Sequence, residues 1–581
     1  MRSIKYYQII FICCLTVLGL GGQQAMAQTE TPSNVRINGL GRTIIENTAL
    51  NGNVGDADTT TANNLLDGSF LLDLQVNARP NQNTEVQTIL RLRNEFGGFF
   101  GAGMTIEVRE LYARGVVADI FRYHVGDLDM KMSPFTFYQH DAEGVVNEAE
   151  IFKARRQVVD YEQFYQGDGK RRMQGGNFDL GLRAGSIFPE VNLNGFFTRV
   201  RGTDFFSLPT RFVAGGSAEL ITTDYGLLRG NYVNTYDAIS IGNFDNGIRN
   251  PVMSVEAEVH LLKKDKLRLN FEGEICQSRI RETQETDAFD KEDSFAEGLF
   301  ALALPENQVR FTLGFRDVGP DFFAMGAQSK RIDFDRDRRV FNRFGNDRRL
   351  RQPGLFDLNR DQGLYTFSLS DVLMPYDPRY SNTMPYGQAT PNRRGLFFGA
   401  EYGVADSLIH ARLDFAQMQE IRGQGTFELK SFTLAKLWGN INLHHLINRE
   451  EVIALNLGLQ VEQTSRDGSE IEQVDLQSTF FEAGVQVEIF KGLDFLAGGK
   501  FLSANGTEYV PDIVRFNEVR DFPGQLQVAD NEQLLAAGLR YRFKSGVFLS
   551  LQAERFSFTN SDTPENNYQI DQLFILYEMK F

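Results

Sequence analysis

Apolar and polar residues alternate one by one along much of the chain. Around the turn LKKD at residues 262–265, one set of alternate positions is apolar and the other is polar or charged. The apolar set is Met253, Val255, Ala257, Val259 and Leu261 before the turn and Leu267, Leu269, Phe271 and Ile275 after it. Successive side chains of an extended strand point to opposite faces, so the pattern predicts a hairpin with one apolar face.

The same hairpin pattern recurs from about residue 70 to the C-terminus. Further examples turn at residues 80–83, 305–307, 404–407 and 544–546. We expect about 20 strands, within a range of roughly 16 to 22. Each strand should have about 9 to 13 residues, which is the length that a tilted strand needs to cross the hydrocarbon core of a membrane.

Short turns alternate with long polar connections between these strands, as in a barrel with tight turns at one rim and large loops at the other. A closed barrel in lipid pairs every backbone group and encloses the charged strand faces around water. We therefore predict an all-β fold, a single closed antiparallel transmembrane β-barrel with short periplasmic turns and long extracellular loops. The loops are expected at about 131–176, 318–361, 373–394 and 505–530. The alternative is a secreted protein built from several β-sheets, such as a large sandwich or a solenoid.

The N-terminus has the features of an export signal. Arg2 and Lys5 precede an apolar run over roughly residues 9–20, and Ala25-Met26-Ala27 gives the small-x-small cleavage pattern. We expect residues 1–27 to be a cleaved signal peptide, residues 28–69 to form an N-terminal segment with a candidate first strand, and residues 70–581 to form the barrel. Cleavage would leave Cys276 as the only cysteine, so the fold should not depend on a disulfide.

The C-terminal segment also alternates. Leu573, Ile575, Tyr577, Met579 and Phe581 share one face, and the other face carries Gln572, Glu578 and Lys580 together with Phe574 and Leu576. A last strand that ends on an aromatic residue resembles that of Gram-negative outer-membrane β-barrel proteins, and the Phe-rich, Trp-poor composition resembles proteins of Bacteroidota. The resemblance implies that Tyr577, Met579 and Phe581 form the signal read by the barrel-assembly machinery. It also implies contact with outer-membrane lipid and lipopolysaccharide.

One subgroup of such barrels, the TonB-dependent receptors, carries a plug domain of more than 100 residues before the barrel. The segment 28–69 is too short for such a domain, so we expect none in this chain.

The connection at residues 131–176 has a helix-compatible centre over about residues 145–161. By resemblance to the constriction loops of porins, this helix could fold into the lumen and narrow it, with Lys153, Arg155 and Arg156 facing a permeating solute. The alternative is a solvated external loop.

The next connection contains an arginine-rich segment, residues 329–354. Its candidate pore-lining or ligand-contacting residues are Arg336, Arg338, Arg339, Arg343, Arg348, Arg349 and Arg351. In a chain of net charge -16, a local excess of positive charge in a pore would concentrate anions. Two alternatives are binding to the anionic groups of lipopolysaccharide and an ion-paired loop that neutralises its own charge.

Asp357, Asn359 and Asp361 have the spacing of a calcium-binding loop. The match then breaks, because Gln362 occupies the position of the turn glycine and Ser368 that of the bidentate Glu, so the metal prediction rests on the spacing of the first three residues alone. The six histidines lie in no nucleophile or zinc motif, and there is no nucleotide-binding glycine pattern. We therefore expect no enzyme activity, no cofactor and no nucleic-acid partner.

Two functional hypotheses remain. The first is a porin-like channel for passive or selective passage of small hydrophilic solutes. The second is a structural barrel, plugged by its own loops, that serves as a subunit of an outer-membrane secretion, assembly or adhesion complex and binds other outer-membrane proteins.

Overall fold

The computed structural model describes most of the chain from residue 34 to the C-terminus. The described residues are 34–52, 64–96, 103–137, 148–163, 173–183, 185, 189–222, 225–240, 244, 246–283, 289–328, 332, 334, 338–339, 350–365, 369–403, 408–447, 449–510, 513–514, 518–519 and 524–581. The expected signal peptide at residues 1–27 therefore lies outside them.

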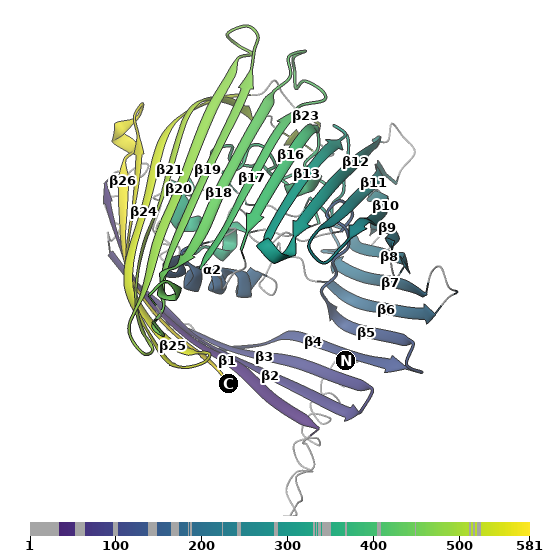
Figure 1. Cartoon of the computed structure of the whole chain (residues 1–581), viewed down its shortest axis with the longest axis horizontal. Coiled ribbons are helices and arrows are strands. Elements are labelled where there is room, and N and C mark those ends of the chain that lie inside the picture. The colour runs from purple at the N-terminus through teal and green to yellow at the C-terminus, as the bar shows by residue number, and fades with distance from the viewer. Residues whose placement is uncertain are drawn as a thin grey trace, which may run out of the picture.

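Twenty-two strands form one closed antiparallel sheet (Figure 1). Each strand pairs with its neighbours in the chain, and the first pairs with the last. Their bounds are β1 Val35–Gly52, β2 Asn64–Asn81, β3 Thr84–Phe96, β4 Thr105–Val117, β5 Phe121–Leu128, β6 Met173–Arg183, β7 Glu190–Arg201, β8 Thr210–Thr222, β9 Gly226–Ala238, β10 Ile248–Lys263, β11 Arg268–Glu282, β12 Asp290–Leu304, β13 Val309–Val318, β16 Arg393–Tyr402, β17 Ile409–Gln419, β18 Ser431–Asn442, β19 Ile453–Arg466, β20 Val474–Phe490, β21 Leu493–Val510, β24 Gly524–Lys544, β25 Val547–Asn560 and β26 Tyr568–Lys580. The predicted fold class is confirmed.

The remaining elements are short. Among the described residues, the α-helices are α2 Glu150–Gln163 and α3 Leu355–Leu358, and the 3-10 turns are η1 Pro305–Asn307, η2 Gln362–Leu364, η3 Gly387–Ala389, η4 Leu443–His445 and η6 Pro564–Asn566. Two small ladders pair β14 Arg338–Arg339 with β15 Leu350–Arg351 and β22 Ile513–Val514 with β23 Glu518–Val519.

The two rims of the barrel differ as the sequence predicts. One rim, here called the turn rim, carries the tight connections and the C-terminus, for example at residues 82–83 and 545–546. The other, the loop rim, carries the connections 129–172 and 319–392. The observed bounds differ from the expected ones in three places. The candidate first strand within residues 28–69 is β1, whereas β2 begins at Asn64, six residues before the expected start of the barrel at residue 70.

The loops at the loop rim also differ from expectation. The two loops expected at 318–361 and 373–394 are one connection, because the segment between them forms η2 and a single bridge from Tyr365 to Ile332 instead of a wall strand. The loop expected at 505–530 is shorter, because β21 continues to Val510 and pairs with β24 from Gly524 onward.

The outer face of the barrel is apolar. Leu573 of β26 and Phe581, directly after this strand, are 47 % and 46 % exposed, whereas Gln572 and Glu578 of β26 point inward and are buried. Exposed Leu, Ile, Val and Phe side chains recur at alternate positions of the other strands. None of the described helices is long and apolar enough to cross a membrane. A closed sheet with an apolar exterior and charged interior is the arrangement that lipid requires, so the chain has the architecture of an outer-membrane β-barrel protein.

Candidate functional site: a lumen filled by two loops

The two long connections of the loop rim fold into the lumen. Figure 1 shows α2, from the first of them, inside the ring of strands. Buried apolar residues of both connections pack with inward residues of the wall in one cluster: Leu50, Ala149, Ile151, Phe152, Leu355, Phe356, Leu496, Leu502, Leu534, Ala536, Phe556, Tyr568 and Ile570. Two further clusters join the connections to β5–β13. The interior is therefore a folded plug made from the loops of the barrel.

Helix α2 is amphipathic, and its apolar side faces the wall. Ile151 and Phe152 are fully buried against the wall, and Val159, two turns further on, is fully buried against Ile332, Leu364 and Tyr365 of the connection 319–392. Inward Phe574 and Leu576 of β26 are also fully buried, against Ala154 and Val158 of α2. Phe574 and Leu576, the two apolar residues on the polar face of the C-terminal strand, thus form the surface on which the helix packs.

Glycines of the wall allow the helix to approach closely. A Cβ atom at Gly484 of β20 would lie 2.2 Å from the Cβ of Ala149, and one at Gly498 of β21 would lie 2.9 Å from Cγ2 of Ile151. Side chains at these two inward positions would therefore collide with the first turn of α2.

Replacing Gly484 with valine should loosen the plug. Overpacking of a filled interior costs about 1 to 3 kcal/mol, so hydrogen exchange of α2 amides should accelerate by roughly tenfold to a hundredfold if the helix opens locally. The matched control is Gly230→Val on β9, where an added Cβ would have no heavy atom within 4 Å. Equal protection of α2 in both variants would contradict the close seating of the helix.

Charged wall residues hold the N-terminal end of α2. Glu482 of β20 accepts a hydrogen bond from the backbone N–H of Ala149 at 2.5 Å, so a carboxylate lies at the positive end of the helix dipole. Lys500 of β21 donates to Glu148, and Arg540 of β24 donates to Glu150 at 2.6 Å. Three neighbouring strands thus fix the start of the helix.

A second set of wall charges, here called the clamp, holds the C-terminal end. Arg91 of β3 donates to Asp73 of β2 at 2.8 Å and to Glu162 of α2 at 2.6 Å. Arg109 of β4 donates to Asp73 and to the backbone oxygen of Tyr161, which is one of the unpaired carbonyls of a helix end. Burial raises the pKa of Glu162, but the nearby arginines Arg91 and Arg109 outweigh burial and lower it overall.

The clamp also reaches the seam of the barrel. Arg42 of β1 lies 3.8 Å from Glu162 and pairs with Glu578 of β26 at 2.8 Å. One charged network therefore joins the plug helix to the first and last strands.

The three basic residues predicted on the loop helix occupy different environments. Arg155 is buried, pairs with Glu46 of β1 at 2.7 Å and lies over the Phe574 ring. Arg156 is also buried and donates to the hydroxyl of Tyr365 at 2.6 Å. Lys153 is partly exposed and pairs with Glu150. In this conformation Arg155 and Arg156 bind protein groups, and Lys153 is the exposed one of the three.

The connection 319–392 is anchored to the wall in the same way. Glu532 of β24 accepts hydrogen bonds from the backbone N–H of Leu355 at 2.8 Å and from the hydroxyl of Tyr380 at 2.6 Å. Arg379 pairs with Asp530 at 2.7 Å, and Arg360 pairs with Glu46.

Part of the predicted arginine-rich segment lies outside the described residues, namely Arg336, Arg343, Arg348 and Arg349. The backbone of Arg338 and Arg339 forms β14, opposite β15. Arg351 is buried and binds the carboxylate of Asp357 through both terminal nitrogens. Asp357 thus has an arginine partner, and no group of three or more His, Cys, Asp or Glu able to hold a metal occurs in the described part of the chain.

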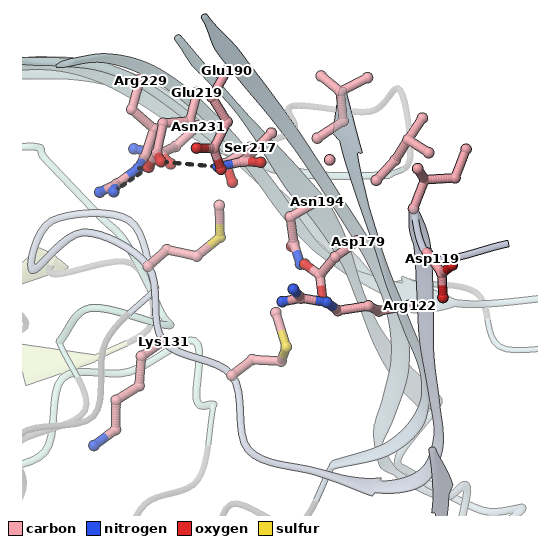
Figure 2. Close-up of a pocket in the computed structure, with 17 residues that line it drawn as sticks. Asp119, Arg122, Lys131, Asp179, Glu190, Asn194, Ser217, Glu219, Arg229 and Asn231 are labelled. Atoms are coloured by element: carbon pink, nitrogen blue, oxygen red, sulfur yellow. Dashed lines mark hydrogen bonds and ion pairs between the residues drawn. The ribbon is translucent and has the colours of Figure 1, made fainter. Parts of the chain in front are cut away.

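A polar cavity of about 510 Å³ lies beside the plug. We call it the vestibule. Figure 2 shows its wall of acidic, amide and basic side chains from β6–β9, with Lys131 of the first long connection opposite. The lining residues are Asp119, Ile120, Arg122, Met130, Lys131, Met132, Asp179, Leu180, Gly181, Glu190, Asn192, Leu193, Asn194, Ser217, Glu219, Arg229 and Asn231. A second cavity of about 410 Å³ lies against β12–β18 and includes Arg310, Arg316, Arg412 and Lys436.

No protein-family model and no curated protein matches the chain. Among solved structures it is similar to a BenF-like porin from Pseudomonas fluorescens Pf-5, with 10% identity over 94% of this chain and 99% of that one and a TM-score of 0.34. It is also similar to the ferric citrate transporter FecA, with 10% identity over 97% of this chain and 81% of that one and a TM-score of 0.47. A third similar structure is the translocation pore of the P pilus usher PapC. It has 7% identity over 94% of this chain and 99% of that one, and a TM-score of 0.37. At these identities the likeness is one of fold, and it assigns no solute and no partner.

Proposed function

We propose that the protein is a porin-like channel of the outer membrane for small hydrophilic solutes, with the turn rim in the periplasm and the loop rim outside. The observation that carries this proposal is the vestibule, a polar cavity inside a closed barrel whose lining carries charges of both signs. A lumen of 22 strands is wide enough to conduct when empty, and here the two inserted loops reduce it to smaller cavities. In this position the loop rim would meet lipopolysaccharide, and the barrel would be inserted by the assembly machinery.

Charge reversal in the vestibule tests the proposal. Purified protein in a planar bilayer should give stepwise conductance, and Lys131→Glu should shift the permeability ratio toward cations by about twofold to threefold, because a charge beside the conduit changes the local ion concentration. The control is Lys266→Glu, which alters an exposed ion pair with Glu306 at the turn rim. An unchanged ratio for Lys131→Glu would contradict the vestibule as the conduit.

A second candidate function is the structural barrel of a larger outer-membrane complex. The observation that favours it is the extent of packing in the lumen, where three apolar clusters fill the space between loops and wall. For this function the wild-type protein should stay silent in the bilayer and should copurify with outer-membrane proteins in stoichiometric amount.

A further inference from the structure

A small cavity between the plug and the wall has an unusual lining. It has a volume of about 70 Å³, several times the 10–15 Å³ or so that one water molecule needs. It lies between α2, the connection 319–392 and the inner faces of β18–β21. The lining residues are Arg156, Ile332, Leu355, Leu358, Asn359, Arg379, Tyr380, Ser381, Lys436, Gln460, Ser478, Phe480, Lys500 and Leu502. Four of these are basic, and none of the described residues that line it is acidic.

Three buried polar atoms of the lining have no hydrogen-bond partner among the described residues. They are Nδ2 of Asn359, Nε of Arg156 and Oγ of Ser478. Asn359 is 2 % exposed and Ser478 is 5 % exposed. The amide of Asn359 has a defined orientation, because its Oδ1 lies 3.5 Å from Nζ of Lys500. Buried donors are normally satisfied, so the Asn359 amide and the Ser478 hydroxyl left around one cavity indicate a missing acceptor, which the Nε of Arg156 could also reach.

The basic groups of the cavity are held in place by carboxylates outside it. Arg379 pairs with Asp377 and Asp530, Lys500 donates to Glu148, and Nε of Arg156 lies 3.9 Å from Oε2 of Glu148, an ion pair beyond hydrogen-bond distance. These pairs neutralise most of the formal charge, so the argument for a ligand rests on the unpartnered donors and on the lack of acidic lining residues. A neutral donor-rich pocket of this kind favours an acceptor such as an oxyanion over a cation.

The remaining lining is apolar. Leu355 and Leu502 are buried, and Leu358 and Phe480 are partly exposed. A phosphate ion has oxygens on every side and would leave some of them against these carbon atoms without a donor. A small carboxylate has oxygens at one end and carbon at the other, which matches the division of the lining.

We propose that this cavity is a binding site for a small organic carboxylate. Asn359, Arg156 and Ser478 donate to the carboxylate oxygens, while the leucines and Phe480 surround its carbon end. Lys436 lines both this cavity and the larger one against β12–β18, so the site has a polar neighbour from which a solute can enter. The site does not depend on conduction, because the protein can bind a carboxylate whether or not it forms a channel.

Binding to the detergent-solubilised full-length protein tests the site. Sodium acetate should raise the thermal unfolding midpoint in a saturable manner above sodium chloride of equal ionic strength, because a ligand that binds only the folded state stabilises it. Sodium phosphate should give no such shift. A phosphate shift without an acetate shift, or no acetate shift, would overturn the proposal.

Substitutions locate the binding. Asn359→Asp replaces a donor with a negative charge of the same shape, and calorimetric titration with acetate should show at least about tenfold weaker binding. The matched control is Asn234→Asp on β9, where another buried asparagine has an unpartnered Oδ1 but lies outside the cavity. If Asn359→Asp does not give a heat-modifiable barrel on electrophoresis, Ser478→Ala removes one donor with less disturbance and should weaken binding about threefold or more. Wild-type affinity in a folded cavity variant would overturn the assignment.

Discussion

Replacing residues 148–163 with a short Gly-Ser linker is expected to raise single-channel conductance about threefold or more, because α2 fills part of the lumen of a barrel that is wide at this strand number, while the connection 319–392 stays in place. The replaced segment contains α2 and its two anchored ends, which contact wall strands from β1 to β4 and from β20 to β26. Its removal leaves the wall pairing intact. The measurement is conductance in planar bilayers at fixed salt concentration.

The control is replacement of residues 423–427, the tip of the connection between β17 and β18, where Phe427 is fully exposed. That variant should conduct like the wild type. If the plug deletion does not assemble, the double substitution Asp73→Asn and Glu162→Gln weakens the clamp alone and should give an intermediate rise. Wild-type conductance in an assembled plug deletion would show that α2 does not restrict the lumen.

Deleting Phe581 is expected to reduce the assembled fraction of the protein by about tenfold or more. Phe581 exchanges two backbone hydrogen bonds with Gly39, at 2.9 and 3.1 Å, beyond the last residue of β26. Its ring lies over Gly39, where a Cβ would be only 2.4 Å from Cζ. Loss of this residue leaves backbone groups of β1 unpaired in lipid and removes an apolar group from the outer face.

Assembly is measured as the heat-modifiable fraction in purified outer membranes. The matched control deletes Phe427, a phenylalanine at a loop tip that makes no strand pairing. Normal assembly without Phe581 would rule out the C-terminal residue as an assembly signal, although the barrel would still be expected to form from its hairpins.

The wall of the barrel was predictable because its determinants are local. The alternation along each strand and the length of each turn can be read from short stretches of sequence, and together they predict the closed antiparallel sheet. The C-terminal strand also contains a sign of the plug. Phe574 and Leu576 are apolar residues on the face that points into the lumen, where the neighbouring positions are polar. Because the sequence does not show that α2 packs against them, these two residues looked only like exceptions to the alternation of polar and apolar positions.

The interior was less predictable because its contacts join distant parts of the chain. Arg155 was expected to face solute, but Glu46 and Gln572 bind it, from strands that come long before and long after it. Asp357 was grouped with Asn359 and Asp361, although its partner is Arg351 on the other side of a turn. No local spacing encodes these pairs, so the polar faces of the strands indicated a charged lumen without showing which charges hold the plug.

The position of α2 has a consequence for the order of folding. The helix belongs to the connection after β5, yet Ala149 binds Glu482 across 333 residues and Arg155 binds Gln572 across 417. Closing loops of this length is entropically costly and slow. The helix can seat only after the last strands are present, so during synthesis and insertion the first half of the wall must persist with its lumen unfilled. Seating of α2 would then be a late event that reports completion of the barrel.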